Sequence, residues 1–151
     1  MTLSYDIIFS NFLGNITEYD FVKMDATDVN EIMVEKLHSV LAEPYIRRLF
    51  SSAVLDDEVQ TFSFEMEYSV EESADIDFVV EVLSKGMVVK WLDPQVKSKV
   101  NIAQMFGTKE QKNFSQSSHL KEIKDLLHST KYDVRALIRD RGYINNTYLD
   151  S

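Results

Sequence analysis

The chain has 151 residues, of which 44% are hydrophobic and 27% charged, and its formal net charge at pH 7 is −9. This length and apolar content match one compact domain and exclude wholesale disorder, while the absence of cysteine excludes disulfides and thiolate metal sites. The acidic balance argues against general nucleic-acid binding, and no run approaches the roughly 20 apolar residues that span a bilayer, so we expect a soluble, unprocessed protein.

Two helices and a bent continuation are expected in the first third of the chain. Residues 4–13 predict a short helix, because Ser4 can cap its first turn and a Gly-Asn pair follows it. A second helix is expected to begin near Asp25 or Asp28, whose carboxylates favour a helix N-terminus. Pro44 interrupts this helix and suits the first turn of a short continuation that is bent relative to it.

An alternating segment follows at residues 62–70. Its five apolar residues are Phe62, Phe64, Met66, Tyr68 and Val70, and their period of two predicts a strand with one buried and one solvated face. A single strand leaves its backbone groups unpaired, so it needs a partner. Either a weaker segment such as 53–57 turns back onto it, or another subunit supplies the pairing by strand addition, which we favour.

Residues 74–92 are expected to form the central helix, because their apolar side chains cover far more than one stripe. Gly86 lies inside this helix, where alanine would be more stable by about 1 kcal/mol. This position suggests that another backbone crosses closely there. The helix is expected to stop at Leu92, because the next residue precedes Pro94 and is disfavoured in a helical conformation.

Four further segments are expected after the central helix. Residues 94–106 predict a short helix, and the polar residues 108–118 predict a loop or lid. The longest helix is expected to begin at a cap within residues 115–118 and to end at Arg141, before a glycine. The final residues, 142–151, are rich in apolar and aromatic side chains, which is typical of a tail that docks on its own domain or on a partner.

The predicted fold class is mainly α. We expect a small helical bundle around the apolar helix at about 74–92, with one β-strand or hairpin region at about 57–70 and an extended C-terminal tail. Residues 1–141 would form a single helical domain, and residues 142–151 would form the docking tail.

Charge is distributed unevenly along the chain. Residues 56–82 contain ten acidic side chains and no lysine or arginine, whereas residues 85–141 contain twelve basic and six acidic side chains. One interpretation is that both regions are solvated faces. The other is that the acidic flank of one copy meets the basic flank of the next, a heterologous contact that generates a ring if the rotation closes.

No pattern in the chain predicts catalysis or a cofactor. The three histidines lack the spacing of a metal site, and the carboxylates that begin at Asp25 lack the glycine and terminal glutamate of a calcium loop. With four glycines, the chain also lacks a phosphate-binding loop. We therefore expect neither an enzyme nor a bound metal or cofactor.

One basic segment is a candidate for contact with phosphate backbones. It lies within residues 97–112 and carries Lys97, Lys99, Lys109 and Lys112 among amide side chains. The alternative interpretation of this segment is a solvated loop.

The order of elements resembles a known family. The chain combines a short N-terminal helix, a proline-bent helix pair, an acidic strand region, the apolar run FVVEVLSKGMVVKWL and a long basic helix that leads into RDRGYINNTYL. In this layout, which spans residues 5–149, the chain resembles the head–tail connectors of tailed phages, a family of small, mostly helical head-completion proteins. It differs from the family in its pronounced alternating strand and its long tail.

The resemblance implies a structural virion protein of the phage neck, made in the host cytoplasm. Copies would form a closed ring, twelve-fold to match the portal, between the portal protein and a downstream neck or tail protein. Genomic DNA would pass through the ring without sequence-specific contact, and an acidic lumen would let it slide, because contact affinity comes mainly from phosphate neutralisation. No membrane would be involved.

The resemblance also assigns partner contacts. The acidic strand face would meet a neighbour's basic helix, with three apolar side chains packed beneath, and the tail would anchor in the portal or in the adjacent subunit. The acidic residues are Glu65, Glu67, Glu71 and Glu72, the basic ones are Lys121, Lys124, Arg135 and Arg139, the apolar ones are Phe62, Phe64 and Met66, and the anchors are Tyr143, Ile144, Tyr148 and Leu149. The alternative function is a small phage or bacterial regulator that binds nucleic acid through residues 97–112 and the last helix.

Overall fold

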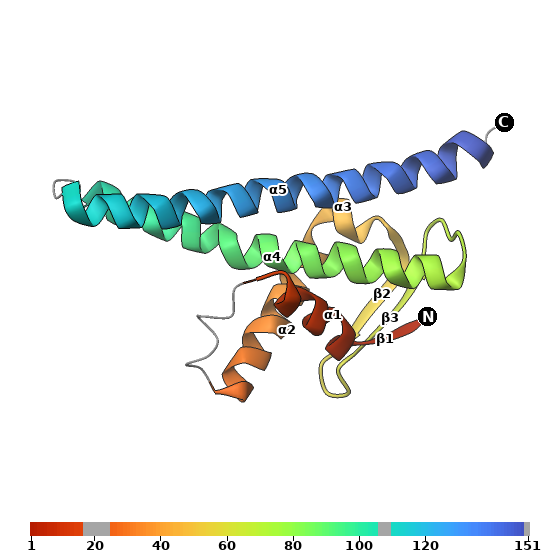
Figure 1. Ribbon diagram of the computed structural model, residues 1–151. Coiled ribbons are helices and arrows are strands. Elements are labelled where there is room, and N and C mark those ends of the chain that lie inside the picture. The colour runs from red at the N-terminus through yellow and green to blue at the C-terminus, as the bar shows by residue number, and fades with distance from the viewer. Residues whose placement is uncertain (17–24, 106–109, 150–151) are drawn as a thin grey trace.

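The computed structural model describes the backbone of residues 1–16, 25–105 and 110–149, and the side chains of residues 1–16, 25–98 and 120–142 (Figure 1). In these ranges the chain is mainly helical, with five helices and a small three-stranded antiparallel sheet. The two long helices, α4 (Glu72–Met105) and α5 (Glu110–Leu149), pack against each other, and α1 and α2 contact α4. The predicted fold class, a mainly helical bundle around a central apolar helix, is confirmed.

The first elements follow local sequence signals. β1 (Thr2–Ser4) leads directly into α1 (Tyr5–Gly14), and Ser4 is the N-cap of this helix. The Ser4 Oγ accepts a hydrogen bond from the backbone N–H of Asp6 at 3.3 Å, which satisfies one of the free amides of the first turn. The predicted helix and its cap are therefore confirmed, whereas the three-residue strand before it was not predicted.

The second helix is also where the sequence predicts it. α2 (Ala26–Ala42) has Asp25 as its N-cap and Glu43 as its C-cap, but the Asp25 side chain does not make the expected capping hydrogen bond. Pro44 then occupies the first turn of α3 (Pro44–Arg47), because its fixed φ suits a helix start and its missing N–H would have had no partner there. The interruption at Pro44 is confirmed.

The sheet corrects the prediction of strand pairing between subunits. β2 (Phe50–Asp56) and β3 (Thr61–Met66) form a hairpin, and β1 pairs with the other edge of β3, so the strand order is β1-β3-β2. Both edges of β3 are matched within the chain. Neither partner has a strong sequence signal, because β1 has three residues and the register of β2 shifts between Phe50 and Ser52.

The buried face of β3 belongs to the core of the chain itself. Phe62, Phe64 and Met66 are 0%, 2% and 8% exposed. Phe50 packs edge-on against both phenylalanines, with ring centroids at 5.4 Å and 5.6 Å. Phe62 and Phe64 are therefore core residues and do not pack beneath a neighbour's helix as predicted, whereas Met66 keeps a small exposed fraction at the edge of a cleft.

α4 continues beyond the proline that was expected to end it. Residues 93–105 extend this helix, so the predicted stop before Pro94 and the separate short helix beyond it are wrong. A proline inside a helix costs one backbone hydrogen bond. Ionic contacts span the same turn, since Asp93 pairs with Lys97 at 2.9 Å and with Lys131 of α5 at 3.9 Å. Tertiary packing against α5 thus outweighs the local signal.

α5 is longer in both directions than expected. Residues 110–118 are helical, so the predicted loop or lid is wrong from Glu110 onward, and the helix runs through Gly142 to Leu149 instead of ending at Arg141. A Cβ at Gly142 would meet nothing within 4 Å, so this glycine has no packing role. Its cost of about 1 kcal/mol relative to alanine is small beside the packing of a long helix.

Gly86 marks a close approach between two helices. A Cβ at this position would lie 2.8 Å from Cγ1 and 3.1 Å from Cγ2 of Val40 on α2. The expected crossing is present, but the neighbour is a side chain and not a backbone. Gly86 lets α2 seat its valine against α4, which fixes where the sheet and α3 lie relative to the long helices.

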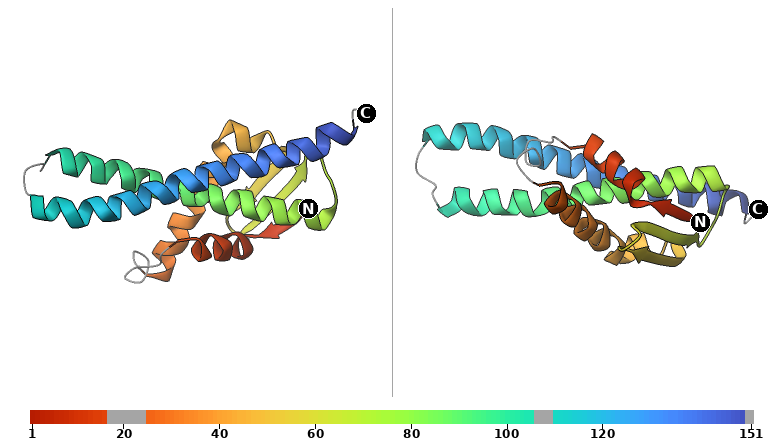
Figure 2. Two further views of the ribbon diagram at one scale, coloured as in Figure 1. Left: turned by 45° about the horizontal axis from the view of Figure 1, so that its top comes forward. Right: turned by 90° about the horizontal axis from the view of Figure 1, so that it is seen from below.

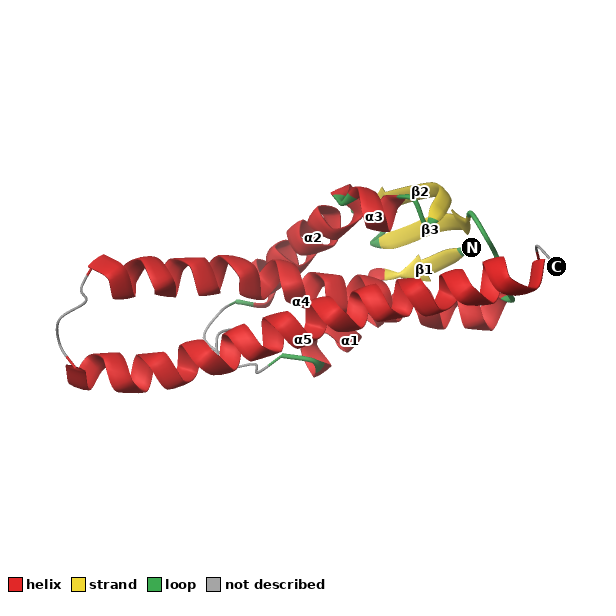
Figure 3. Cartoon of the chain, turned by 90° about the horizontal axis from the view of Figure 1, so that it is seen from above, coloured by secondary structure: helices red, strands yellow, loops and turns green. Residues whose placement is uncertain are grey.

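The long helices extend past the other elements. Among the described side chains, the last buried one on α4 is Leu92 and the first buried one on α5 is Ile123. We call residues 93–105 and 110–122 the arm and the other described residues the body. At 1.5 Å per residue, 13 residues of α4 carry the arm about 20 Å beyond Leu92, and Figures 2 and 3 show it projecting away from the sheet.

Candidate interaction surfaces

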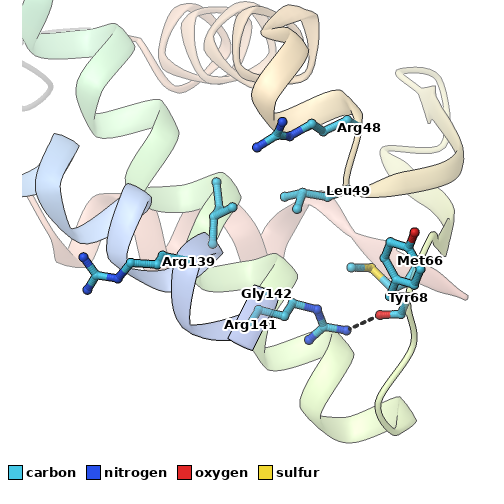
Figure 4. Close-up of a pocket in the computed structure, with 8 residues that line it drawn as sticks. Arg48, Leu49, Met66, Tyr68, Arg139, Arg141 and Gly142 are labelled. Carbon is cyan, nitrogen blue, oxygen red and sulfur yellow. Dashed lines mark hydrogen bonds between the residues drawn. The ribbon is translucent and has the colours of Figure 1, made fainter. Parts of the chain in front are cut away.

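A cleft with a volume of about 420 Å³ opens within the body, between α5 and the segments around α3 and β3 (Figure 4). Its wall comes from three places in the chain: the junction of α3 and β2, the end of β3, and α5. The lining residues are Arg48, Leu49, Met66, Tyr68, Ile138, Arg139, Arg141 and Gly142. We call it the arginine cleft.

Backbone hydrogen bonds hold the α3–β2 side of the cleft. Arg48 is the C-cap of α3, and its N–H donates to the Pro44 carbonyl at 3.1 Å. The Leu49 N–H donates to the Ile46 carbonyl at 3.0 Å, and the Leu49 carbonyl accepts from the Glu67 N–H at 2.9 Å. The tight turn after α3 therefore fixes where both Arg48 and Leu49 lie.

A buried ion pair fixes the α5 side of the cleft. Arg141 and Asp75, whose side chains are 9% and 0% exposed, form this pair, and Arg141 also donates to the Tyr68 carbonyl at 3.0 Å. Asp75 accepts from the Ser69 hydroxyl at 2.6 Å and from the Val70 N–H at 3.1 Å. The pair thus joins α5 to the start of α4 and to the segment after β3.

Hydrogen bonding determines the charge state of this pair. Burial raises the pKa of Asp75, but hydrogen bonds from Ser69, Arg141 and the Val70 N–H lower it by more, so the pKa lies below its ordinary value. The Arg141 guanidinium also lies 4.5 Å from the centre of the Phe78 ring, a cation–π contact. Because Arg141 makes these contacts within the chain, its role is to stabilise the fold.

The remaining two arginines of the cleft face solvent. Arg48 and Arg139 are exposed on opposite sides of the opening, whereas Leu49, Met66 and Ile138 are at least half-buried. The Tyr132 hydroxyl and the Asp140 carboxylate raise the pKa of Arg139, which therefore stays protonated at every pH of interest. Two permanent cations above an apolar floor suit a ligand group that has a carboxylate beside an aliphatic side chain.

A second surface lies at the other end of the same two strands. Residues 56–60, which comprise the last residue of β2 and the connection to β3, are called here the hairpin turn. Asp56 Oδ1 accepts from the backbone N–H groups of Glu58 at 3.1 Å and Val59 at 3.2 Å. Gln60 has a φ of 58°, in the left-handed region that such a turn requires, and its carbonyl accepts from the Tyr5 N–H at 2.9 Å.

Two side chains of the body clamp the hairpin turn through Asp57. The Tyr5 hydroxyl donates to Asp57 at 2.7 Å, and His38 Nε2 lies 2.9 Å from both carboxylate oxygens. Hydrogen bonds from Tyr5 and then from His38 lower the pKa of Asp57, and burial together with this carboxylate raises the pKa of Tyr5. The tip of the turn still projects, since Glu58 is exposed and Val59 is 69% exposed.

The predicted partner-binding residues that the structure describes come from several elements. Glu65, Glu67, Glu71 and Glu72 are exposed, and Glu65 pairs with the amino terminus at 2.9 Å. On α5, Lys121, Arg135 and Arg139 are exposed and Lys124 is half-buried, and only Arg139 lines the arginine cleft. The side chains of Tyr143, Ile144, Tyr148 and Leu149 lie outside the described residues.

The candidate DNA-facing lysines are described only at one position. Lys97 is exposed and pairs with Asp93 at 2.9 Å, and this nearby carboxylate weakens any contact of Lys97 with a phosphate. Lys99 and Lys112 have side chains outside the described residues, and Lys109 lies outside them altogether.

The sequence predicted neither the arginine cleft nor the buried ion pair between Asp75 and Arg141. The residues of the cleft come from three separated stretches, and no spacing relates them. The hairpin turn did carry a signal, since the run DDEVQ places an isolated valine beside three acids just before a strand.

Other searches of the described residues give negative findings. They contain no group of three or more histidine or acidic side chains placed to hold a metal ion. None of the helices, over the part that is described, combines the length and apolarity that crossing a bilayer demands. Comparison of the chain with family models, curated proteins and solved structures finds no match.

Proposed function

We propose that this protein is a structural subunit of a tailed-phage neck, in which copies form a ring that connects the portal and head to the tail and lines the DNA passage. The observation that carries the proposal is the arm: two helices that project about 20 Å from a small body. Helices gain most of their stability from packing an apolar face. Within one copy, the described contacts between the arm and the body include Asp93 with Lys131 and Val96 with the core, near the base of the arm. Neighbouring copies or a docking platform would cover the part that projects further.

The surface of the body is consistent with a DNA passage. Its exposed side chains include Glu58, Glu67, Glu71 and Glu72, whereas the region from 56 to 82 contains no lysine or arginine. Such a surface repels phosphate, so DNA would slide past it. The layout of elements in the sequence supports the same proposal.

The internal pairing of β3 changes how copies would associate. Strand addition to β3 and packing on its apolar face no longer support a ring, because β1 and β2 occupy both edges and the face is buried. Contact between copies would instead be made by side chains on exposed surfaces. The acidic and basic surfaces at the two ends of the hairpin are therefore the features that support association.

The test is the mass of the purified full-length protein by light scattering, alone and with the portal protein of the phage that encodes it. The proposal predicts a closed oligomer, or assembly of copies on the portal. A chain that stays monomeric or dimeric at tens of micromolar and never joins the portal would contradict it. A salt-sensitive gel shift of duplex DNA by such a monomer would favour the alternative, a nucleic-acid-binding regulator.

A further inference from the structure

We infer that neighbouring subunits associate head to tail, with the hairpin turn of one copy seated in the arginine cleft of the next. This inference rests on the proposed ring and names the contact that would hold it together. Its occupant is a second copy of this chain, chosen because the acidic turn and the basic cleft have complementary charge and lie at opposite ends of one hairpin.

The placement of the two surfaces requires different copies. Phe50 and Met66 pair at the cleft end of the hairpin, whereas Asp56 and Thr61 pair at the turn end. Strands rise about 3.4 Å per residue, so the two ends lie about 20 Å apart. A rigid hairpin cannot fold its turn back into its own cleft. A contact between two different surfaces of identical subunits is heterologous, and it closes into a ring when the rotation permits.

The chemistry of the turn matches that of the cleft. Glu58 supplies a carboxylate for Arg48 and Arg139, the two exposed cations of the cleft. Val59 supplies an aliphatic side chain for the floor formed by Leu49, Met66 and Ile138. Arg141 is paired with Asp75 and Arg139 with Asp140 at 3.5 Å, so the incoming acid would meet Arg48 first and would compete with Asp140 for Arg139.

Both surfaces are rigid before they meet. The turn is held by Asp56, which bonds its backbone, and by Asp57, which is bound to Tyr5 and His38. The cleft is held by the buried pair and by the turn after α3. Little conformational freedom would be lost on docking, which is how a small contact, repeated around a ring, can suffice.

The experiment is a charge exchange in the full-length chain. Glu58→Arg reverses the turn, and the double substitution Arg48→Glu with Arg139→Glu reverses the cleft. Each variant alone is expected to weaken self-association at least about tenfold at low salt, because like charges then face each other. An exposed acid on α2 provides the matched control, and Glu31→Arg should assemble like the wild type.

A mixture of the two reversed variants decides whether the surfaces meet. The arginine turn of one variant fits the acidic cleft of the other, and the glutamate turn of the second fits the arginine cleft of the first, so an alternating assembly should form. Circular dichroism of each variant separates lost association from lost folding. Assembly of either variant alone at wild-type strength, or failure of the mixture when both are folded, would overturn the inference.

The outcomes also separate this inference from the proposed function. If the wild type assembles and Glu58→Arg assembles equally well, the ring stands and the contact lies elsewhere. If the wild type itself stays monomeric with and without the portal, the proposed function fails and the contact fails with it.

Discussion

An aspartate holds the chain in place at each end of the β2–β3 hairpin, but the two carboxylates differ in burial. At each end an aspartate anchors the chain through hydrogen bonds to residues far away in sequence. Asp75, near the cleft, is fully buried with Arg141, whereas Asp57, in the turn, is 49% exposed and bonded to Tyr5 and His38. A buried charge without a partner costs a large amount of folding free energy, whereas an exposed charge that loses its partner can be solvated by water. The first end is therefore held by a buried ion pair and the second by hydrogen bonds at a partly exposed carboxylate.

The largest expected effect on stability comes from breaking the buried ion pair between Asp75 and Arg141. Arg141→Met leaves the Asp75 carboxylate buried without its cation, and we expect a loss of about 3–5 kcal/mol in the free energy of unfolding, measured by urea denaturation. The matched control is Arg141→Met with Asp75→Asn, which removes both charges and should recover a substantial part of the loss. A cost below about 1 kcal/mol for the single variant would show that the pair does not hold α5 in place.

A smaller effect is expected at the turn. Tyr5→Phe removes the hydroxyl that donates to Asp57 and keeps the buried ring, so we expect a loss of about 1 kcal/mol in the same urea measurement. Because the turn would then be held by fewer bonds, self-association should weaken as well. If Tyr5→Phe is less stable by about as much as Arg141→Met, the contrast between the two ends is wrong.

The smallest effect concerns pH. Folding lowers the pKa of Asp57, so the folded protein binds this proton less readily than the unfolded chain. The resulting stability is present above the unfolded pKa of about 3.9 and disappears as the pH falls through the lower folded value. At this exposed site the contribution is expected to stay below about 1 kcal/mol.

The measurement compares the wild type with Asp57→Asn by urea denaturation between pH 7 and pH 2.5. The difference in unfolding free energy should shrink as the pH falls below about 4, because protonation removes the charge that the variant lacks. A difference that stays constant over this range would mean that the charge of Asp57 contributes nothing to the clamp.

Local signals account for the parts of the fold that the sequence predicts well. Ser4, Asp25 and Pro44 act within one turn of their own position, so caps and interruptions can be inferred from neighbours in the chain. The alternation around Phe62 and Phe64 also identifies a strand, but β3 ends at Met66, and Tyr68 and Val70, which were expected on its buried face, are 59% and 47% exposed. These features can be recognised without knowing which segments pack against them, and the helix starts, the interruption and the strand are present in the structure.

The failures share one cause, which is tertiary packing that overrides a local preference. Pro94 and Gly142 are helix-breaking signals, yet both lie inside helices that pack against each other. β2 overlaps the segment 53–57 that the sequence offered as one possible partner, but pairing between subunits was favoured and β1 was not predicted, because strand pairing depends on which segments meet and not on the period of either one. The arginine cleft was missed for the same reason, since Arg48 and Arg139 come together only through the fold.

The amino-acid sequence by itself determined the mainly helical class, the apolar centre of α4 and the separation of acidic from basic residues, because periodicity and composition act along the chain. Only the tertiary structure decided that β3 is matched on both edges, that Asp75 meets Arg141 across 66 positions, and that turn and cleft occupy opposite ends of one hairpin. Those relations depend on burial and on contacts between distant segments, and the free energy that selects them exists only once the core has formed.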